Sequence, residues 1–293
     1  MWTDKDGKTW YKGNLHLHTT VSDGVKTPEE AFELYRSRGY DFIARTDHWH
    51  ASEGGYYKEM LLLPGCEYDV GRVEEEGMYH ILGIGCGQIA EKPRPPVQEI
   101  IDRIHAAGGL AVLAHPAWSL NTPEQILRLR DVDFTEIFNS VSDLPRNCRP
   151  YSGLILDMAA VKGRMLRLAA TDDVHFYIPG DTCRSFIYLQ AEALTEEKVM
   201  EALHAGRFYA SQGPTLDVRR EENKIVVDCS PAESIVFYTD KVWEKHRAIV
   251  GKDVTHAVFE LKDQAFVRVE IRDSEGRFAW SQYIDLREPE STL

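Results

Sequence analysis

Residues 13–24 read Gly-Asn-Leu-His-Leu-His-Thr-Thr-Val-Ser-Asp-Gly, and this stretch decides how the rest of the chain is interpreted. Residues 13–18 are a short, mostly apolar run that predicts a β-strand ending in histidines. On a strand, residues two apart point to the same face, so His16 and His18 can bind one cation together. Gly24 permits a tight turn that lets Asp23 face back toward the two histidines.

Further histidines and carboxylates recur along the chain in similar surroundings. Asp47 and His48 end a second predicted strand, and His115 directly follows another. Glu67 is expected in a loop behind an apolar strand, and His80 inside a strand. Each residue alone has an ordinary structural explanation, but together they predict one site. The nine candidate ligands are His16, His18, Asp23, His48, Glu67, His80, His115, Asp173 and His175.

Six imidazoles and three carboxylates without a thiolate indicate a metal centre. Nitrogen and oxygen ligands suit Zn²⁺, Mn²⁺ or Fe²⁺ rather than a thiolate site. Nine ligands are too many for one ion, and they suffice for two or three divalent ions with positions left for water. Glu67 is the natural bridge between ions.

The spacing of apolar residues predicts an α/β fold. Over the first two thirds of the chain, strand patterns alternate with helices, two of which begin at the N-caps Thr27 and Thr122. This alternation predicts βαβ units, and polar residues behind the strands would gather at the mouth of a β/α barrel. From about residue 215 short strands and turns predict a small antiparallel β-sandwich. We therefore expect two domains, 1–214 and 215–293.

Several of these motifs resemble those of the PHP superfamily, named for polymerase and histidinol phosphatase domains. The resemblance covers roughly residues 10–215 and implies a distorted (β/α)7 barrel with two or three metal ions. The matching motifs are His16-Leu17-His18-Thr19 with Ser22-Asp23-Gly24, Thr46-Asp47-His48, His115-Pro116, Asp173-Val174-His175, and the pair Glu67 and His80.

The resemblance also implies how the ligands divide among the ions. One ion would be held by His16, His18, Glu67 and Asp173, a second by Glu67, His80 and His115, and a third by Asp23, His48 and His175. The segment from Gly206 to Pro214, which leads into the sandwich, looks like the two-domain branch related to carbaryl hydrolases, the CehA/McbA type.

Four residues beside the ligands are candidates for the catalytic machinery. Arg45 stands where many relatives carry an aliphatic residue, and it is either a bidentate phosphate clamp or a salt-bridged structural residue. Asp47 or Asp172 could orient ligands or relay a proton. Asp172 is adjacent to Asp173, but the spacing to the following histidine favours Asp173 as the ligand. His50 is a candidate partner of a metal-bound imidazole.

Three functions remain open from the sequence. A phosphoesterase would use clustered cations to lower the pKa of a bridging water and to bind phosphate oxygens. A carboxylic ester or carbamate hydrolase would use the same centre on a carbonyl. A non-catalytic, metal-stabilised binding module is the third possibility, although a complete ligand set argues against it. Phosphoester hydrolysis of a small or nucleotide-like substrate is the favoured prediction.

The composition of the chain indicates which classes of partner it can bind. Among 293 residues, 34 Lys and Arg against 47 Asp and Glu give a formal net charge of −13, which disfavours strong duplex nucleic-acid binding and allows a small anionic or ester substrate. No apolar run of membrane-spanning length and no signal peptide is evident. Five scattered cysteines suggest reduced thiols, so we expect a cytoplasmic protein without membrane partners. An oligomer could form through the C-terminal domain.

Overall fold

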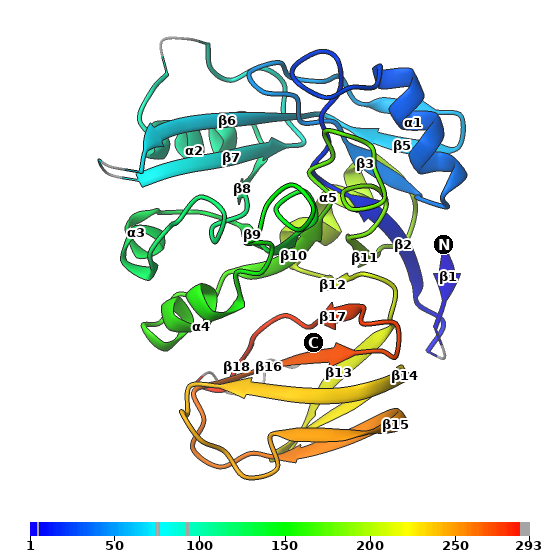
Figure 1. Ribbon diagram of the computed structural model, residues 1–293, viewed down its shortest axis with the longest axis vertical. Coiled ribbons are helices and arrows are strands. Elements are labelled where there is room, and N and C mark those ends of the chain that lie inside the picture. Colours follow the sequence, from blue (N-terminus) through cyan, green and yellow to red (C-terminus); the bar gives the residue numbers. More distant parts are fainter. Residues whose placement is uncertain (5, 74, 76, 92–93, 288–293) are drawn as a thin grey trace.

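The computed structural model describes residues 1–4, 6–73, 75, 77–91 and 94–287. The protein is a mixed α/β structure whose strands form two sheets (Figure 1). The smaller sheet has the order β10-β9-β8-β7-β6. Its strands are β6 (Gly65–Arg72), β7 (Gly77–Ile84), β8 (Leu110–Leu113), β9 (Phe134–Asn139) and β10 (Arg167–Thr171).

The larger sheet combines strands from the N-terminal and the C-terminal parts of the chain. Its strands in order are β13 (Leu216–Glu221), β14 (Lys224–Thr239), β16 (Phe266–Arg272), β17 (Phe278–Trp280), β12 (Phe208–Ser211), β11 (Phe186–Gln190), β2 (Thr9–Asn14), β3 (Phe42–Ala44), β5 (Met60–Leu63) and β4 (Gly55–Tyr57). The strands β1 (Trp2–Thr3), β15 (Ala248–Glu260) and β18 (Ile284–Asp285) pair at its sides with β2, β14 and β16.

The distorted (β/α)7 barrel that the resemblance implies is not closed by hydrogen bonds among the described residues, because the strands divide between the two sheets. Pro64 alone separates β5 in the larger sheet from β6 in the smaller one, and proline has no N–H to continue a ladder. β7 is antiparallel to both of its neighbours. The connection from β6 to β7 is too short for the crossover that parallel pairing requires.

The two sheets nevertheless enclose a common core. Leu82, Val112 and Phe134 of the smaller sheet pack in one cluster with Phe42 and Leu61 of the larger sheet, and all five are buried. Isolated parallel bridges also join Leu17 to Val174 and His48 to Glu67. Since these bridges connect segments that carry candidate ligands, the junction of the two sheets positions the site.

The helices are α1 (Pro28–Ser37), α2 (Val97–Ala106), α3 (Pro123–Arg128), α4 (Gly153–Val161) and α5 (Glu196–Ala205). The predicted caps are confirmed: Thr27 accepts from the backbone N–H of Glu30, and Thr122 caps α3 in the same way. α4 was not predicted. It has no side-chain cap, because the hydroxyl of Ser152 accepts from the backbone of Ala117 instead.

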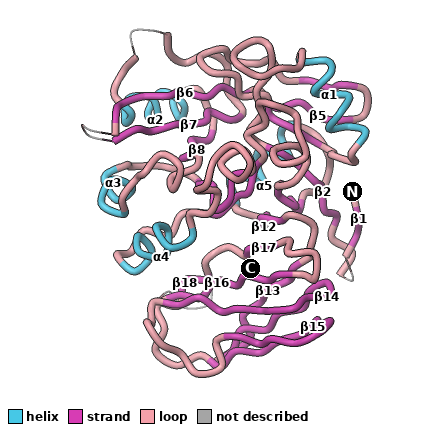
Figure 2. Tube along the Cα trace, in the orientation of Figure 1, coloured by secondary structure: helices cyan, strands magenta, loops and turns pink. Residues whose placement is uncertain are grey.

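The chain beyond α5 is antiparallel β-structure, which Figure 2 shows as a layer of strands apart from the helices. β14 pairs with β13 near its start, with β16 near its end, and with β15 along both parts, across two shifts of register. The expected separate sandwich is not separate in its hydrogen bonding, because β17 pairs with β12 and so continues the larger sheet. The domain boundary at residue 214 stays a prediction, and residues 288–293 of the second range lie outside the described residues.

A buried arginine joins the C-terminal strands to α4. Arg268 of β16 is fully buried and donates from Nε and Nη2 to the two carboxylate oxygens of Asp157, both at 2.7 Å. The hydroxyl of Tyr283 also donates to Asp157, at 2.8 Å. This bidentate pair therefore holds the two parts of the fold together. Among the described residues, no helix combines the length and the apolar character needed to cross a membrane.

Candidate metal centre

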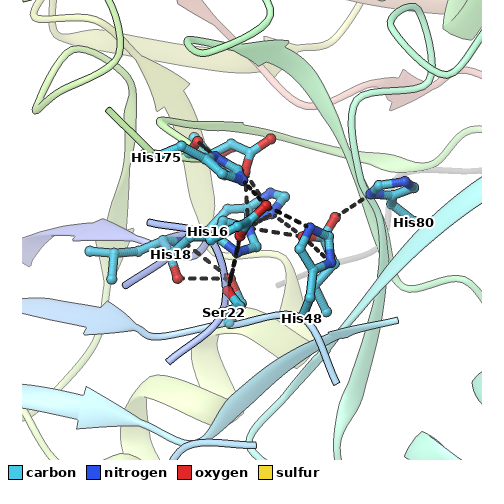
Figure 3. Close-up of polar contacts among 12 residues, drawn as sticks. His16, His18, Ser22, His48, His80 and His175 are labelled. Atoms are coloured by element: carbon cyan, nitrogen blue, oxygen red, sulfur yellow. Dashed lines mark hydrogen bonds and ion pairs between the residues drawn. The ribbon is translucent and has the colours of Figure 1, made fainter. Parts of the chain in front are cut away.

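The structure brings all nine predicted ligands together at the junction of the two sheets (Figure 3). His16 and His18 follow β2, His48 follows β3, and His115 comes two residues after the end of β8. Seven of the nine line one cavity of about 220 Å³, and His16 and His18 lie buried behind it. Glu67 was expected in a loop, but it lies inside β6, where strand pairing fixes its direction.

The candidate ligand atoms form three overlapping groups. Within each group the ligand atoms lie within 4.8 Å of one another. His18, His48 and Glu67 each belong to two groups, so the groups are joined in a ring. The groups are His16, His18, Glu67 and Asp173; His18, Asp23, His48 and His175; and His48, Glu67 and His80.

The first group is the most deeply buried. The Nε2 atoms of His16 and His18 are 3.1 Å apart, and each lies near Oε2 of Glu67, at 3.1 and 2.9 Å. Oδ1 of Asp173 lies 3.0 Å from Nε2 of His16 and 3.1 Å from Nε2 of His18. Four potential donor atoms thus converge on one point that is closed to solvent.

Glu67 uses its two oxygens in different directions. Oε2 faces His16, His18 and Nδ1 of His48, the last at 3.4 Å. Oε1 lies 2.7 Å from Nδ1 of His80 and 3.5 Å from Nε2 of His115. A carboxylate that divides its oxygens between two sets of imidazoles has the geometry of a bridging ligand. His115 joins the site through this contact, although it is outside the three groups.

The group around Asp23 is the most open. The side chain of Asp23 is 53% exposed, and its Oδ2 lies 3.3 Å from Nε2 of His175 and 3.8 Å from Nε2 of His48. Nδ1 of His18 lies 3.4 Å from the other oxygen of Asp23. Because His18 and His48 present their second ring nitrogens here, this group depends on residues that also face the deeper groups.

These residues fit divalent metal ions. Among the described residues, Nδ1 of His48 and Oδ1 of Asp173 are buried without a hydrogen-bond partner, although buried polar atoms are normally paired. Both atoms point into groups of nitrogen and oxygen ligands, where a cation would satisfy them. The donor set of imidazoles and carboxylates suits Zn²⁺, Mn²⁺ or Fe²⁺.

The charges of the cluster are strongly coupled. Burial alone would lower the pKa of His18, but Asp173 and Glu67 raise it to about 9. Burial alone would raise the pKa of Glu67, but the surrounding histidines hold it well below its usual range. Protonated imidazoles therefore balance the buried carboxylates of the metal-free cluster, and an incoming cation must displace their protons.

Metal affinity is consequently expected to rise with pH. The proton on His18 is bound below about pH 9 and blocks Nε2, so its release at higher pH favours coordination. The same raised pKa stabilises the metal-free fold at low pH, and that contribution is lost as pH rises toward about 9. Calorimetric Mn²⁺ titrations in buffers of different ionisation enthalpy should show more proton release at pH 7 than at pH 9. Absence of proton release at pH 7 would contradict this.

The predicted catalytic residues lie outside the cavity lining of the described chain. Asp47 is buried and accepts from the backbone N–H of Thr19 at 2.7 Å and from the hydroxyl of Ser22 at 2.8 Å. Arg45 forms an ion pair with Asp47, as the salt-bridged alternative expects, and the phosphate clamp stays a prediction. The pair fixes the turn that carries Asp23.

Asp172 and His50 also lie outside the cavity lining of the described residues. Asp172 is buried and accepts from the hydroxyl of Tyr35 at 2.7 Å and from the backbone N–H groups of Arg184 and Ser185. Burial raises its pKa to about 6. His50 is exposed, and neither residue is placed to touch a group in the cavity. The structure thus gives no support to a direct catalytic role for either.

Glu136 in β9 is a residue that the sequence analysis missed. It is fully buried, and its Oε1 lies 2.7 Å from Nδ1 of His16, while Oε2 accepts from the backbone N–H of His115 at 2.8 Å. Asn139 donates to Glu136 at 2.7 Å and to Asp173 at 3.1 Å. The contact between Glu136 and Nδ1 of His16 directs Nε2 of His16 toward the ligand cluster. The sequence signal that could have identified Glu136 is a carboxylate inside an otherwise apolar strand.

Replacement of Glu136 by glutamine is expected to weaken metal binding about 10- to 100-fold. The amide nitrogen would face either His16 or the backbone N–H of His115, so one donor would meet another donor. Chelator competition followed by elemental analysis measures the effect. Glu197→Gln, at an exposed position on α5, is the matched control. Unchanged metal affinity in Glu136→Gln would show that the contact does not position His16.

The chain is similar to several known proteins. No protein-family model matches the chain. An uncharacterised protein of Methanocaldococcus jannaschii is 28% identical over 142 residues, which are 44% of this chain and 82% of that protein. A lesion-specific endonuclease of Pyrococcus furiosus aligns over 67% of this chain and 56% of its own, with 16% identity and a TM-score of 0.47.

A further solved structure aligns with almost the whole chain. It is a two-domain protein of Bacteroides vulgatus that contains a predicted PHP-like metal-dependent phosphoesterase. The alignment covers 98% of both chains, with 16% identity and a TM-score of 0.57. The more specific resemblance to the CehA/McbA type stays a prediction. In both of its parts, this chain has the fold of that two-domain, PHP-like protein.

Proposed function

We propose that this protein is a metal-dependent phosphoesterase. The observation that supports it is the convergence of six imidazoles and three carboxylates around Glu67, beside a cavity of about 220 Å³. The solved two-domain protein of the same fold is described as containing a predicted phosphoesterase of this kind, which favours phosphoester over carboxylic ester hydrolysis.

Two or three divalent ions bound by the nine ligands would supply Lewis acidity toward phosphoryl oxygens and a nucleophile at neutral pH. Glu67, whose two oxygens face different imidazoles, would be a ligand shared between ions. Glu136 would hold His16 in the tautomer that presents Nε2, and Asp47 would hold the turn that carries Asp23. The substrate would be a small anionic ester, whose phosphoryl end a cavity of about 220 Å³ has room for.

The test compares three esters under one condition. Purified protein is analysed for its metal content, loaded with Mn²⁺, and assayed on nitrophenyl phosphate, bis-nitrophenyl phosphate and nitrophenyl acetate. We expect the wild-type protein to hydrolyse at least one of the two phosphate esters. We expect His16→Ala to lose this activity. Turnover of the acetate alone would replace the proposal by carboxylic ester hydrolysis. Stoichiometric metal without any turnover would favour a non-catalytic binding module.

A further inference from the structure

Five residues outside the ligand cluster also line the cavity, and we call them its wall. These are Trp118, Val141, Ser142, Asn147 and Phe176. Three of the five are apolar, and two of those are aromatic. If the proposed ions bind the phosphoryl group, an alcohol portion that stays inside the cavity contacts this wall. The chemistry of the wall therefore determines which alcohol portion binds well.

Trp118 is held rigidly in this wall. Its ring meets the rings of His115 and His80 edge to face, with centroids 4.9 and 5.6 Å away. Its indole N–H donates to the side-chain oxygen of Asn147 at 3.1 Å, and Asn147 in turn donates to the backbone carbonyl of Val141 at 3.0 Å. An aromatic ring that is already fixed loses little conformational entropy when a ligand packs on it.

Phe176 contributes an aromatic ring that is partly open to solvent, at 36% exposure. The guanidinium of Arg146 lies 4.1 Å from the centroid of this ring, which is a cation–π contact. Within the described part of the chain, Arg146 has no ion pair with a carboxylate, whereas nearby Arg184 is paired with Asp143 at 2.8 Å. Arg146 thus places a positive charge beside the cavity, which complements an anionic ester.

The size of the cavity limits what can contact this wall. An apolar cavity of about 150 Å³ accommodates one benzene ring in a protein interior. The volume of about 220 Å³ therefore has room for one aromatic ring together with part of a phosphoryl group. Flat aromatic groups gain most from contact with aromatic side chains.

We infer that Trp118 and Phe176 form a subsite that binds a planar aromatic group in the alcohol portion of the ester. The inference rests on the proposed function for its placement of the phosphoryl group. It does not depend on turnover, because contact between aromatic rings can be measured by binding alone.

The test uses a matched pair of ligands that ester hydrolysis cannot cleave. Phenylphosphonate and methylphosphonate are titrated calorimetrically into the Mn²⁺-loaded full chain, with inorganic phosphate as a third ligand. We expect phenylphosphonate to bind about tenfold more tightly than methylphosphonate. In Phe176→Ala and in Trp118→Leu this preference should fall to about threefold or less, with the affinity for methylphosphonate nearly unchanged. Phe176→Ala is the safer variant because its side chain is partly exposed.

Trp243→Ala is the matched control, because Trp243 is 75% exposed between β14 and β15, outside the cavity lining. It should retain the full preference. Equal affinity of the two phosphonates for the wild-type protein would overturn the inference while leaving the proposed function intact. Binding of phenylphosphonate alone, with loss in Phe176→Ala, would support the subsite and count against phosphoester hydrolysis. If none of the three ligands binds, the inference is overturned.

Discussion

Replacement of Glu67 by glutamine is expected to lower the metal content per chain and to reduce turnover roughly 10³-fold, equivalent to about 4 kcal/mol in the activation free energy. Oε2 of Glu67 lies 2.9 Å from Nε2 of His18, and Oε1 lies 2.7 Å from Nδ1 of His80. An amide carries no charge and has only one oxygen, so it cannot serve as a bridging carboxylate. Elemental analysis and steady-state kinetics on the same preparation measure both effects.

Glu53→Gln is the control for this variant. Glu53 is exposed, so its replacement removes the same charge from the surface and leaves the cluster unchanged. It should keep wild-type metal content and turnover. If Glu67→Gln retains the full metal content and loses activity only, Glu67 acts on the substrate and is not a bridge. Retention of both properties would remove Glu67 from the metal centre altogether.

Replacement of Arg268 by alanine is expected to lower the free energy of unfolding by about 3–5 kcal/mol. The change leaves the Asp157 carboxylate, whose side chain is only 17% exposed, without its cation. It also removes two hydrogen bonds of 2.7 Å between β16 and α4. Urea denaturation followed by circular dichroism measures the loss.

Arg272→Ala provides a matched control on the same strand. Arg272 has a side-chain exposure of 51% and a 3.9 Å contact with Glu233, so its removal should change stability by less than about 1 kcal/mol. The double variant Arg268→Met with Asp157→Leu should regain part of the lost stability, because the charges of Arg268 and Asp157 are then removed together, while the Glu270 carboxylate 3.4 Å from Nη1 of Arg268 remains. Equal effects of Arg268→Ala and Arg272→Ala would contradict a structural role for the buried pair.

Local sequence signals located many of the secondary-structure elements. The capping residues Thr27 and Thr122 identified the starts of α1 and α3, because a side-chain cap is a contact between neighbours in the sequence. Continuous apolar runs identified β7 and β8. α4 was missed, because Ser152 bonds to Ala117 far away in sequence and leaves the helix without a local start signal.

The sheet arrangement required tertiary information. Alternating strands and helices are compatible with a closed barrel, but the antiparallel pairing of β7 and the transfer of the chain between sheets at Pro64 depend on long-range hydrogen bonds. The pairing of β12 with β17 depends on them as well, and it joins the two parts that the change in sequence pattern suggested would be separate.

The candidate site likewise depends partly on local sequence and partly on tertiary contacts. Nine residues with metal-binding side chains could be named from the sequence, since their chemistry and their motifs are local properties. The spacing also favoured Asp173 over its neighbour Asp172 as a ligand. The contacts that hold these side chains are long-range and could not be named: Asp172 accepts from Tyr35, and Asp173 faces His16. Glu136 gains its importance from His16, which is far away in the chain, and Trp118 packs against the distant His80 as well as the nearby His115. The sequence by itself determined which atoms are available to bind ions, and the packing of two sheets against each other decided which of those atoms meet.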